Sequence, residues 1–531
     1  MSLLLGNILS TLCGMSKQTR YVTTPIYYVN DRPHIGHVYT TTLCDVYSRA
    51  MRQVGHDVFF LTGTDEHGIK VEQSAVAKGV SPQELADTNA AEFQSIMEKF
   101  DLSTDEFIRT TDPDHCTQVQ EFVSTLLERG DVYLGTFKGW YDKGQEEYHT
   151  ETSAREHKYV SPISGNPLVQ ASEKNYYFKL SAYQERLEML FKSNPNFVRP
   201  ESRRNEVLGR LKDGLQDVPI SRTNFSWGIK MPCDSEHVIY VWIDALFNYI
   251  TALGLGNHDG QHFEERSKYW PATYHVIGKE ILWFHSIIWP AVLMALDIPL
   301  PTCIYAHSFW ISEGRKMSKS LGNFIDMETI DSYVDRYGMD AWRYYLVTHG
   351  PLGATDADFT AGKFHDVYNA HLVNTVGNCT SRVTAMIGKY FDGVVPSEYS
   401  GDDRIEISDV DWPTICSEAV DNWISAMEQF IIGQAVETAM GLIRRVDLFI
   451  NDTEPYKLAK DDSRQEDLGA ILYQCLEVLR IASVLLMPVI PEKMKTFHDA
   501  TSIDPNEPLA WGGVKAGTSV SKVALFPRLN Q

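Results

Sequence analysis

The pattern of apolar and polar positions divides the chain into two parts of different character. Near the amino terminus, the runs 21–28 (YVTTPIYY) and 58–63 (VFFLTG) are rich in β-branched and aromatic residues, which is typical of buried strands. Between them Gly55 marks a helix end, and apolar residues recur at the spacing of one helix face: Leu43, Val46, Ala50 and Met51. A strand, a helix and a second strand predict a parallel β-α-β unit with a right-handed connection.

After about residue 360 the strand signals fade and long amphipathic stretches follow. Their spacing predicts helices over 364–390, 421–450 and 466–486, with the polar stretch 392–412 joining the first to the second. This part of the chain is predicted to be a helix bundle. By composition alone, the role of such a bundle would be structural.

Length, composition and charge limit the class of protein. The chain has 531 residues, so about two to four structural units are expected. Apolar and charged contents of 43% and 22% are those of a globular protein, and no run of about 18 apolar residues predicts a membrane span. The net charge of −22 argues against a protein coated with positive charge, but it leaves room for local basic patches that hold nucleic acid. Eight cysteines without a CxxC pair favour free thiols in a reducing compartment.

The first candidate for chemistry is His34-Ile35-Gly36-His37, at the start of the first predicted helix. Residues three apart share a helix face, so the two histidines should lie together. A helix N-terminus offers unpaired N–H groups and partial positive charge, which suits a phosphate, and Gly36 allows close approach. Taken alone, the motif would more often be two exposed histidines beside a turn.

The second candidate is the loop 312–323, SEGRKMSKSLGN, which has glycines at both sides of its lysines. Lys316 and Lys319 on a mobile segment could close over a triphosphate and neutralise the charge that develops on departing pyrophosphate. Alone, it would be an ordinary solvated basic loop. The order of the two motifs on an alternating strand–helix chain predicts a phosphate-handling pair.

With these motifs the chain resembles class I aminoacyl-tRNA synthetases and, more narrowly, the methionyl-tRNA synthetase family of the bacterial and organellar type. The resemblance runs from about residue 21 to the closing FPRL. It rests on the combination of TTPIYYVNDRPHIGH, LTGTDEHG, IRTTDPDH, YVWIDALFNY, VIGKEILWFHSIIWPA and GRKMSKSLGN.

The fold class implied by the resemblance is α/β: a Rossmann-like parallel sheet with an inserted connective domain, followed by an all-α anticodon-binding helix bundle. The expected division is a flexible leader (1–18), the first half of the catalytic domain (19–130), a connective domain without zinc (131–225), the second half of the catalytic domain (226–302), the KMSKS loop and stem-contact region (303–362), the anticodon-binding domain (363–505) and a C-terminal tail (506–531).

The reaction implied by the resemblance joins methionine to tRNA(Met). The methionine carboxylate attacks the α-phosphorus of Mg²⁺-ATP, pyrophosphate leaves, and the methionyl-adenylate is passed to the 3′ end of the tRNA. The catalytic residues carried over are His34, His37, Lys316 and Lys319. The expected ATP contacts are His34, Gly36, His37, Gly278, Lys279, Glu280, Lys316, Ser318 and Lys319.

A methionine site needs a slot for a flexible thioether, aromatic contacts for sulfur and an acid for the α-ammonium. Asp65 resembles the family's ammonium acceptor, and Leu246 stands where many members carry Pro. We expect Trp242 and Phe284 to rearrange when methionine binds. The full set carried over is Ile26, Tyr28, Asp65, Trp242, Ala245, Leu246, Tyr249, Phe284 and His285. Without the surrounding motif, Trp242 and Tyr249 would be interpreted as core packing.

The inserted segment offers a check on the substrate. Synthetases for isoleucine, valine and leucine face near-isosteres, because one methylene is worth only about 1–3 kcal/mol, and they add a large editing domain. The segment 131–225 is too short for one. No cysteine lies between Cys116 and Cys233, and Asp142 and Gln145 stand where many relatives have zinc-binding cysteines. We therefore predict no structural zinc, although His149 and His157 could in principle bind a metal.

In the helical half, the resemblance places the anticodon contacts at Asn378, Arg382 and Tyr456. An amide and a guanidinium can recognise base edges, and Tyr456, at the place of a family Trp, can stack on a base. The sequence closes with FPRLNQ, so we expect no appended domain and a monomer. No membrane association is expected.

The first 30 residues contain no Asp or Glu. This suits either an organelle-import leader or a disordered tail, so a cytoplasmic location is predicted, with the mitochondrial matrix as the alternative. Two other classes of protein remain open at this point. Small nucleotidyltransferases share a histidine pair but are much shorter, and a non-catalytic tRNA-binding relative would be expected to lose the histidines and lysines that are intact here.

Overall fold

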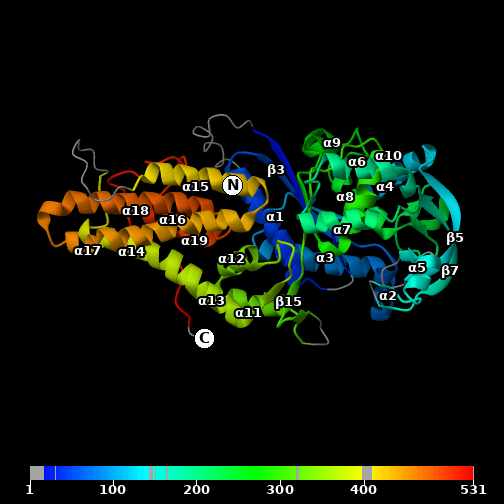
Figure 1. Ribbon diagram of the computed structural model, residues 1–531, viewed down its shortest axis with the longest axis horizontal. Helices are drawn as coiled ribbons and strands as arrows, with labels where there is room; N and C mark the ends of the chain where they lie inside the picture. Colours follow the sequence, from blue (N-terminus) through cyan, green and yellow to red (C-terminus); the bar gives the residue numbers. More distant parts are fainter. Residues whose placement is uncertain are drawn as a thin grey trace.

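The computed structural model describes residues 17–29, 32–142, 147–149, 151–162, 165–317, 322–397 and 410–529. Figure 1 shows a molecule drawn out along one axis. The carboxyl-terminal helices, in yellow to red, form one end, a parallel sheet and its helices fill the middle, and an antiparallel sheet in cyan lies at the far end. The two parts predicted from the apolar pattern are therefore arranged end to end.

The central sheet has seven strands, and all of its pairings are parallel. Across the sheet, β3 (Asp57–Asp65) pairs with β1 (Thr19–Thr23), and β13 (Tyr274–Gly278), β14 (Ile304–His307) and β8 (Val198–Arg199) follow in that order. Two short strands, β2 (Tyr27–Tyr28) and β4 (Glu106–Arg109), also pair with β3. The predicted α/β class with a parallel sheet is confirmed.

The prediction of one strand over 21–28 is wrong, because β1 ends at Thr23 and β2 starts at Tyr27. Pro25 has no N–H to donate to a neighbouring strand, which favours an interruption at this point. After β1, the Thr24 hydroxyl lies 2.7 Å from the Thr62 hydroxyl. The interruption brings Ile26 to the carboxyl edge of the sheet, where it lines the main cavity.

Helices cover both faces of the sheet (Figure 1). The first of them, α1 (Ile35–Gln53), starts directly after His34, as predicted. The other helices of this half are α2 (Ile69–Lys78), α3 (Pro82–Lys99), α4 (Pro113–Glu128), α6 (Gln184–Ser193), α7 (Glu201–Leu211), α8 (Val241–Thr251), α9 (Gln261–Arg266), α10 (Trp289–Ala295), α11 (Met327–Tyr337) and α12 (Met339–His349).

Except for its last short strand, the segment predicted as an insertion contributes its strands to two sheets. One is antiparallel and consists of β5 (Val132–Asp142), β6 (Glu147–His149), β7 (Val169–Phe178) and β9 (Val218–Pro219), with α5 (Glu151–Glu156) beside it. The other is the central sheet, because β8 pairs with β14. Two three-stranded sheets complete the strands: β10 (Ser221–Arg222), β11 (Lys230–Met231) and β12 (Asp234–Ile239), and β15 (Trp310–Ser312), β16 (Arg315–Lys316) and β17 (Ala357–Phe359).

The helical half is a bundle. A continuous helical stretch consists of α13 (Ala361–Val367), a π-helical segment (Tyr368–Gly377) and α14 (Asn378–Tyr390). After the linker follow α15 (Trp412–Glu428), α16 (Ile432–Thr453), the short α17 (Pro455–Leu458), α18 (Gln465–Leu486) and α19 (Pro491–Thr501). By length and composition, 462–486 could cross a membrane, but 94% of its apolar window is buried in the structure, as in the core helix of a bundle.

The single helix predicted over 421–450 is wrong, because the chain turns between α15 and α16. Phe430 adopts a φ of +58° at this turn. Its side chain is fully buried, with ring centroids 5.1–5.3 Å from Tyr47, Tyr274 and Tyr305 of the sheet half. The apolar spacing therefore continues through a turn that packs against the sheet.

Arg343 connects the two halves and takes part in a buried ion pair. Arg343 on α12 lies 2.6 Å from Asp45 on α1, and both side chains are at most 1% exposed. Arg343 also donates to the carbonyls of Val489 (3.1 Å) and Pro488 (2.9 Å), just before α19. The Arg343 and Arg49 guanidiniums hold the pKa of the Asp45 carboxyl below its usual value, against the opposing effect of burial.

Candidate active site

The main cavity has a volume of about 540 Å³ and lies at the carboxyl ends of the central strands, between β2, β3, β13 and β14. Ligands of open parallel α/β sheets bind at this edge. Most residues predicted for the site line the cavity, including all those predicted for methionine: Ile26, Tyr28, His34, Gly36, His37, Asp65, Trp242, Ala245, Leu246, Tyr249, Gly278, Glu280, Phe284 and His285. The structure thus brings together residues as far apart in the sequence as Ile26 and His285, which are separated by 259 positions.

His34 and His37 form a capping box at the start of α1. The backbone N–H of Gly36 donates to His34 Nδ1 (3.1 Å), and the backbone N–H of His34 donates to His37 Nδ1 (3.2 Å). A nitrogen that accepts a hydrogen bond carries no proton, so each ring is neutral with its proton on Nε2. A side chain at Gly36 would lie 2.9 Å from the His34 ring, so glycine is required for this cap.

The neutral state of His37 also follows from its surroundings. Burial and the neighbouring His34 hold the pKa of His37 well below its usual value. The ring centroid of His37 lies 3.9 Å from that of His34, 4.7 Å from Tyr27 and 5.1 Å from Phe93. Two neutral imidazoles with defined N–H groups therefore stand at the positive end of α1.

The opposite wall of the cavity is aromatic. Trp242 of α8 stacks on Phe284, with ring centroids 4.1 Å apart and an interplanar angle of 12°. His285 Nδ1 lies 3.0 Å from the Ile281 carbonyl, and its Nε2 lies 2.8 Å from the Tyr249 hydroxyl. Burial lowers the pKa of His285 to about 4. The imidazole is therefore neutral, donates from Nδ1 and accepts from Tyr249, which leaves this wall uncharged.

Acidic groups lie where β3 ends. Asp65 is 8% exposed and lines the cavity. The next residue, Glu66, is fully buried and accepts from Arg109 at 2.7 and 2.8 Å. Because Glu66 is neutralised by its own partner, the carboxylate that this turn offers to the cavity is that of Asp65.

The lysine loop starts from the short hairpin of β15 and β16. Lys316 is exposed at its end, and the Asn323 amide donates to the carbonyls of Ser312 (3.2 Å) and Lys316 (3.3 Å). Beyond the loop, the Ile35 N–H donates to the Ile325 carbonyl at 3.1 Å. The return of the loop therefore contacts the start of α1, next to the two histidines. Ser318 and Lys319, predicted for this loop, lie outside the described residues.

Comparisons with known proteins agree with this geometry. A family model described as "tRNA synthetases class I (M)" matches residues 20–160 and 155–384. The chain is 42% identical to the methionine–tRNA ligase of Halalkalibacterium halodurans over 97% of this chain and 79% of that protein, and 41% identical to that of Bacillus subtilis over 96% and 78%. The chain belongs to the methionine–tRNA ligase family of class I tRNA synthetases.

Solved structures of this family have the same fold. The Mycobacterium tuberculosis methionyl-tRNA synthetase in complex with methionyl-adenylate superposes with a TM-score of 0.86 at 34% identity, covering 96% of this chain and 100% of that chain. The free form of the same enzyme gives 0.83 at 32% identity, covering 98% and 99%. The predicted family, fold class and enzyme class are confirmed, and the roles of individual site residues remain predictions.

Some residues at this site were missed by sequence reasoning. Thr40 and His307 line the cavity, and the Thr40 hydroxyl meets His307 Nε2 at 2.8 Å. His307 ends β14, so the rule that ligands bind at the carboxyl ends of strands could have identified it. Lys279, predicted to contact ATP, does not line the cavity; its ammonium lies 2.6 Å from Asp356 and 4.4 Å from the centroid of the Phe309 ring.

The residues predicted to bind the anticodon lie on α14 and α17, toward the far end of the helical half (Figure 1). Asn378 is exposed, and Arg382 lies one turn later, where it donates to Asp447 (3.1 Å) and Asn451 (3.3 Å). Tyr456 is 46% exposed, and its hydroxyl donates to Glu454 at 2.9 Å. We call Asn378, Arg382, Asn451, Glu454 and Tyr456 the helical-end cluster.

Metal ligands are sparse in the part of the chain that the structure describes. Among those residues, no group of three or more His, Cys, Asp and Glu side chains could hold a metal ion. The seven cysteines in the same ranges are free thiols. The absence of structural zinc remains a prediction.

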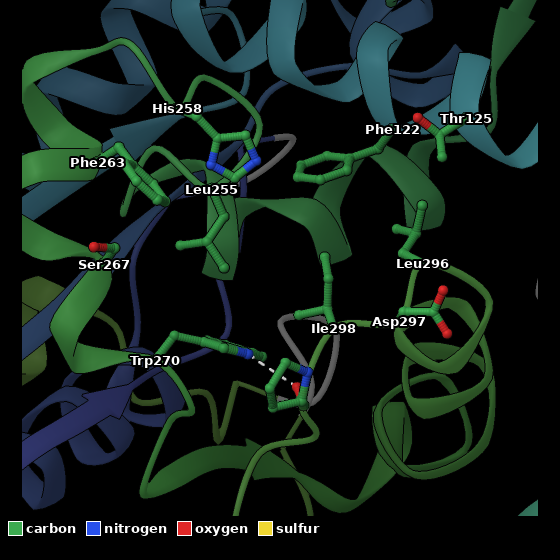
Figure 2. A pocket seen from close by; sticks show the side chains of 11 residues that line it. Phe122, Thr125, Leu255, His258, Phe263, Ser267, Trp270, Leu296, Asp297 and Ile298 are labelled. Carbon is green, nitrogen blue, oxygen red and sulfur yellow. Dashed lines mark hydrogen bonds between the residues drawn. The ribbon is translucent and has the colours of Figure 1, made fainter.

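A second cavity, of about 370 Å³, lies at the other end of β13, among α4, α9 and the segment after α10. Figure 2 shows its mainly apolar lining, with Leu255, Ile298 and Phe122 around the space and the Trp270 indole N–H bonded to the Pro299 carbonyl at 2.9 Å. None of the predicted site residues lines it.

Proposed function

We propose that the main cavity is the place where this methionine–tRNA ligase activates methionine with ATP. The observation that carries the proposal is that one cavity of about 540 Å³ joins the histidine cap of α1 to an uncharged aromatic wall and a buried carboxylate. The first feature suits phosphate, and the other two suit the side chain and the ammonium of methionine.

The residues of the chain act by positioning and by charge stabilisation. The methionine carboxylate attacks the α-phosphorus of ATP and pyrophosphate leaves, so no protein nucleophile is required. The Nε2–H groups of His34 and His37 donate to phosphate oxygens, and the cap that fixes their tautomers removes the cost of reorienting them. Lys316 and Lys319 stabilise the charge on the departing pyrophosphate.

Methionine lies against the Trp242–Phe284 stack, with its ammonium toward Asp65. An uncharged aromatic wall favours a polarisable thioether over a charged or strongly polar side chain. The neutral state of His285 supports this arrangement, because a charged imidazole would attract an acidic side chain instead. Mg²⁺ enters as part of the substrate Mg²⁺-ATP.

The transfer step requires tRNA(Met) to contact both ends of the molecule. The 3′ end of the tRNA reaches the adenylate in the cavity, while the helical-end cluster binds the anticodon. The exposed Tyr456 ring supports base stacking, and the Arg382 guanidinium and Asn378 amide support contacts with base edges.

ATP–pyrophosphate exchange with each of the twenty amino acids, without tRNA, tests the proposal. Methionine alone should support exchange, and His37→Asn should abolish most of it. His157→Ala, at an exposed histidine outside the cavity, is the matched control and should leave exchange unchanged. Exchange with leucine or isoleucine would mean that the pocket assignment is wrong, and no exchange with any amino acid would overturn activation in the absence of tRNA.

We also propose a monomer in the cytoplasm, with the mitochondrial matrix as the alternative location and no structural zinc. Sedimentation at several protein concentrations, cell fractionation and metal analysis of the purified protein test these three points separately. Stoichiometric zinc, a concentration-dependent dimer, or recovery with mitochondria and loss of residues 1–18 would contradict them.

A further inference from the structure

A buried polar cluster lies directly behind the proposed methionine subsite. It consists of Asp244 on α8, His67 just after β3 and His115 on α4. Asp244 is fully buried, and the two histidines are 6% and 2% exposed. One carboxylate oxygen lies 2.7 Å from His67 Nδ1, and the other lies 2.8 Å from His115 Nε2. We call these three residues the Asp244 cluster.

The hydrogen bonds of the cluster determine where its protons lie. The two histidines hold the pKa of Asp244 below its usual value even though burial alone would raise it, so the carboxylate is ionised and accepts from both rings. His67 then carries a proton on Nδ1 and His115 carries one on Nε2. His115 Nδ1 lies 2.7 Å from the Thr251 hydroxyl.

The cluster connects the two walls that would hold the amino acid. On the α8 side, Asp244 lies between Trp242 and Ala245, which line the cavity. On the β3 side, His67 follows Asp65 by two residues, and Asp65 also lines the cavity. The Asp244–His67 hydrogen bond is therefore a direct connection between the aromatic wall and the turn that carries the acid.

The turn that carries Asp65 and His67 packs closely against the cavity wall. Gly68 has a φ of +105°, and a side chain there would lie 3.3 Å from the Tyr28 hydroxyl and 3.5 Å from Val241. Its N–H donates to the Trp227 carbonyl at 3.1 Å, while the Trp227 indole donates to the Glu66 carbonyl at 2.7 Å. The turn is thus packed against two residues of the cavity wall, Tyr28 and Val241, and is held from behind by Asp244.

We propose that Asp244, with His67 and His115, is a positioning unit that sets the distance between Asp65 and the Trp242 wall and so determines the affinity for methionine. The unit touches no substrate and acts through the residues that do. The inference rests on the proposed assignment of the cavity as the methionine site. Since the histidine cap of α1 is built separately, loss of the unit weakens methionine binding while ATP binding is retained.

The test measures the effect of a variant on methionine and on ATP separately. In Asp244→Asn, an amide can accept from only one histidine, and its NH₂ group faces the N–H of the other unless that ring changes its tautomer. We expect the KM for methionine in exchange, and the Kd for methionine alone by calorimetry, to rise at least about tenfold, which corresponds to about 1.4 kcal/mol. The KM for ATP should change less than about twofold on the same scale.

Two matched pairs of variants distinguish positioning from simple loss of packing. An Asn side chain can place an N–H near the position of His67 Nδ1, and a Gln side chain can place one near that of His115 Nε2. His67→Asn and His115→Gln should therefore keep a methionine KM close to that of the unmodified protein, whereas His67→Ala and His115→Ala should raise it. These pairs remain informative if Asp244→Asn does not fold.

Glu477→Gln supplies a control for the loss of a buried carboxylate elsewhere. Glu477 on α18 is fully buried and pairs with Arg480 at 2.7 Å, within the helical half. This variant should lower the melting temperature without separating the two KM values. Equal changes in both KM values for Asp244→Asn, or a lower melting temperature with an unchanged methionine Kd, would overturn the inference. If the unmodified protein shows no methionine-dependent exchange, the proposed function itself fails, and the variants are not needed to show it.

Discussion

The main cavity and the helical-end cluster would bind different substrates of the same reaction. The two sites differ in the burial and the preorganisation of their side chains. In the cavity, Tyr249 and His285 are at most 2% exposed, and backbone groups fix the orientation of His34 and His37. At the helical end, Tyr456 is 46% exposed, and its hydroxyl donates to the partly exposed Glu454. A small substrate is surrounded by preformed groups, whereas a nucleic acid supplies much of its own surface.

The largest effect should come from the part of the cavity that is organised before substrate binds. His37→Asn keeps an acceptor near the His34 N–H but removes the Nε2–H donor. Since loss of one preorganised donor at a developing charge typically costs about 100- to 1,000-fold, adenylate formation should slow by that factor. Single-turnover formation of methionyl-adenylate measures it.

His37→Ala is the companion variant, because it removes the cap as well as the donor. A slower rate for His37→Asn with little further loss for His37→Ala would place the effect in the donor. Rates near that of the unmodified protein for both variants would show that His37 has no part in activation.

A smaller effect on activity is expected at the helical end. It should appear in aminoacylation of tRNA but not in the activation of methionine. Tyr456→Ala should lower aminoacylation of tRNA(Met) by about tenfold, since stacking on one base is worth about 1–3 kcal/mol. Exchange without tRNA should be unchanged, because α17, which carries Tyr456, lies at the end of the helical half away from the central sheet (Figure 1). Tyr456→Phe removes only the hydroxyl bonded to Glu454 and should retain aminoacylation. A loss in exchange, or no loss in either assay, would refute the assignment.

The features that the sequence predicted well are those with a local signal. The order strand, helix, strand and the position of His34 before α1 follow from local spacing, and the motifs identified many of the residues that line the cavity. The turn at Phe430 was missed because its apolar residues are buried against the sheet, so helical periodicity passes through it. The strand break at Pro25 had a local signal, the missing N–H, that a β-branched run outweighed.

Contacts between distant residues could not be predicted from spacing. Thr40 and His307 are 267 positions apart, and Asp244 and His67 are 177 apart. Each of these residues is an unremarkable polar side chain in its own segment. Their contacts arise only when the sheet brings the ends of β3, β14, α1 and α8 together, so pairings between distant segments are less visible in the sequence than local motifs.

The smallest effect on activity is expected between the two regions, where neither substrate would bind. Asp340 at the start of α12 is 1% exposed, and its carboxylate accepts from the Lys493 N–H of α19 at 2.7 Å. Burial raises the pKa of Asp340 to about 6. A raised pKa in the folded state means that its contribution to stability is full below the unfolded value, about 4, and is lost as the pH rises through 6.

The free energy of unfolding of Asp340→Asn, minus that of the unmodified chain, should therefore be larger at pH 8 than at pH 4. A shift of about two pKa units limits the gain in unfolding free energy to about 3 kcal/mol, and the amide oxygen can still accept from Lys493. Denaturant unfolding of both proteins at the two pH values measures the difference. Exchange and aminoacylation should be unchanged, because Asp340 belongs to neither the cavity nor the helical-end cluster. A variant that is less stable at pH 8 than at pH 4, relative to the unmodified chain, would show that the Asp340 carboxylate stabilises the junction in its charged form.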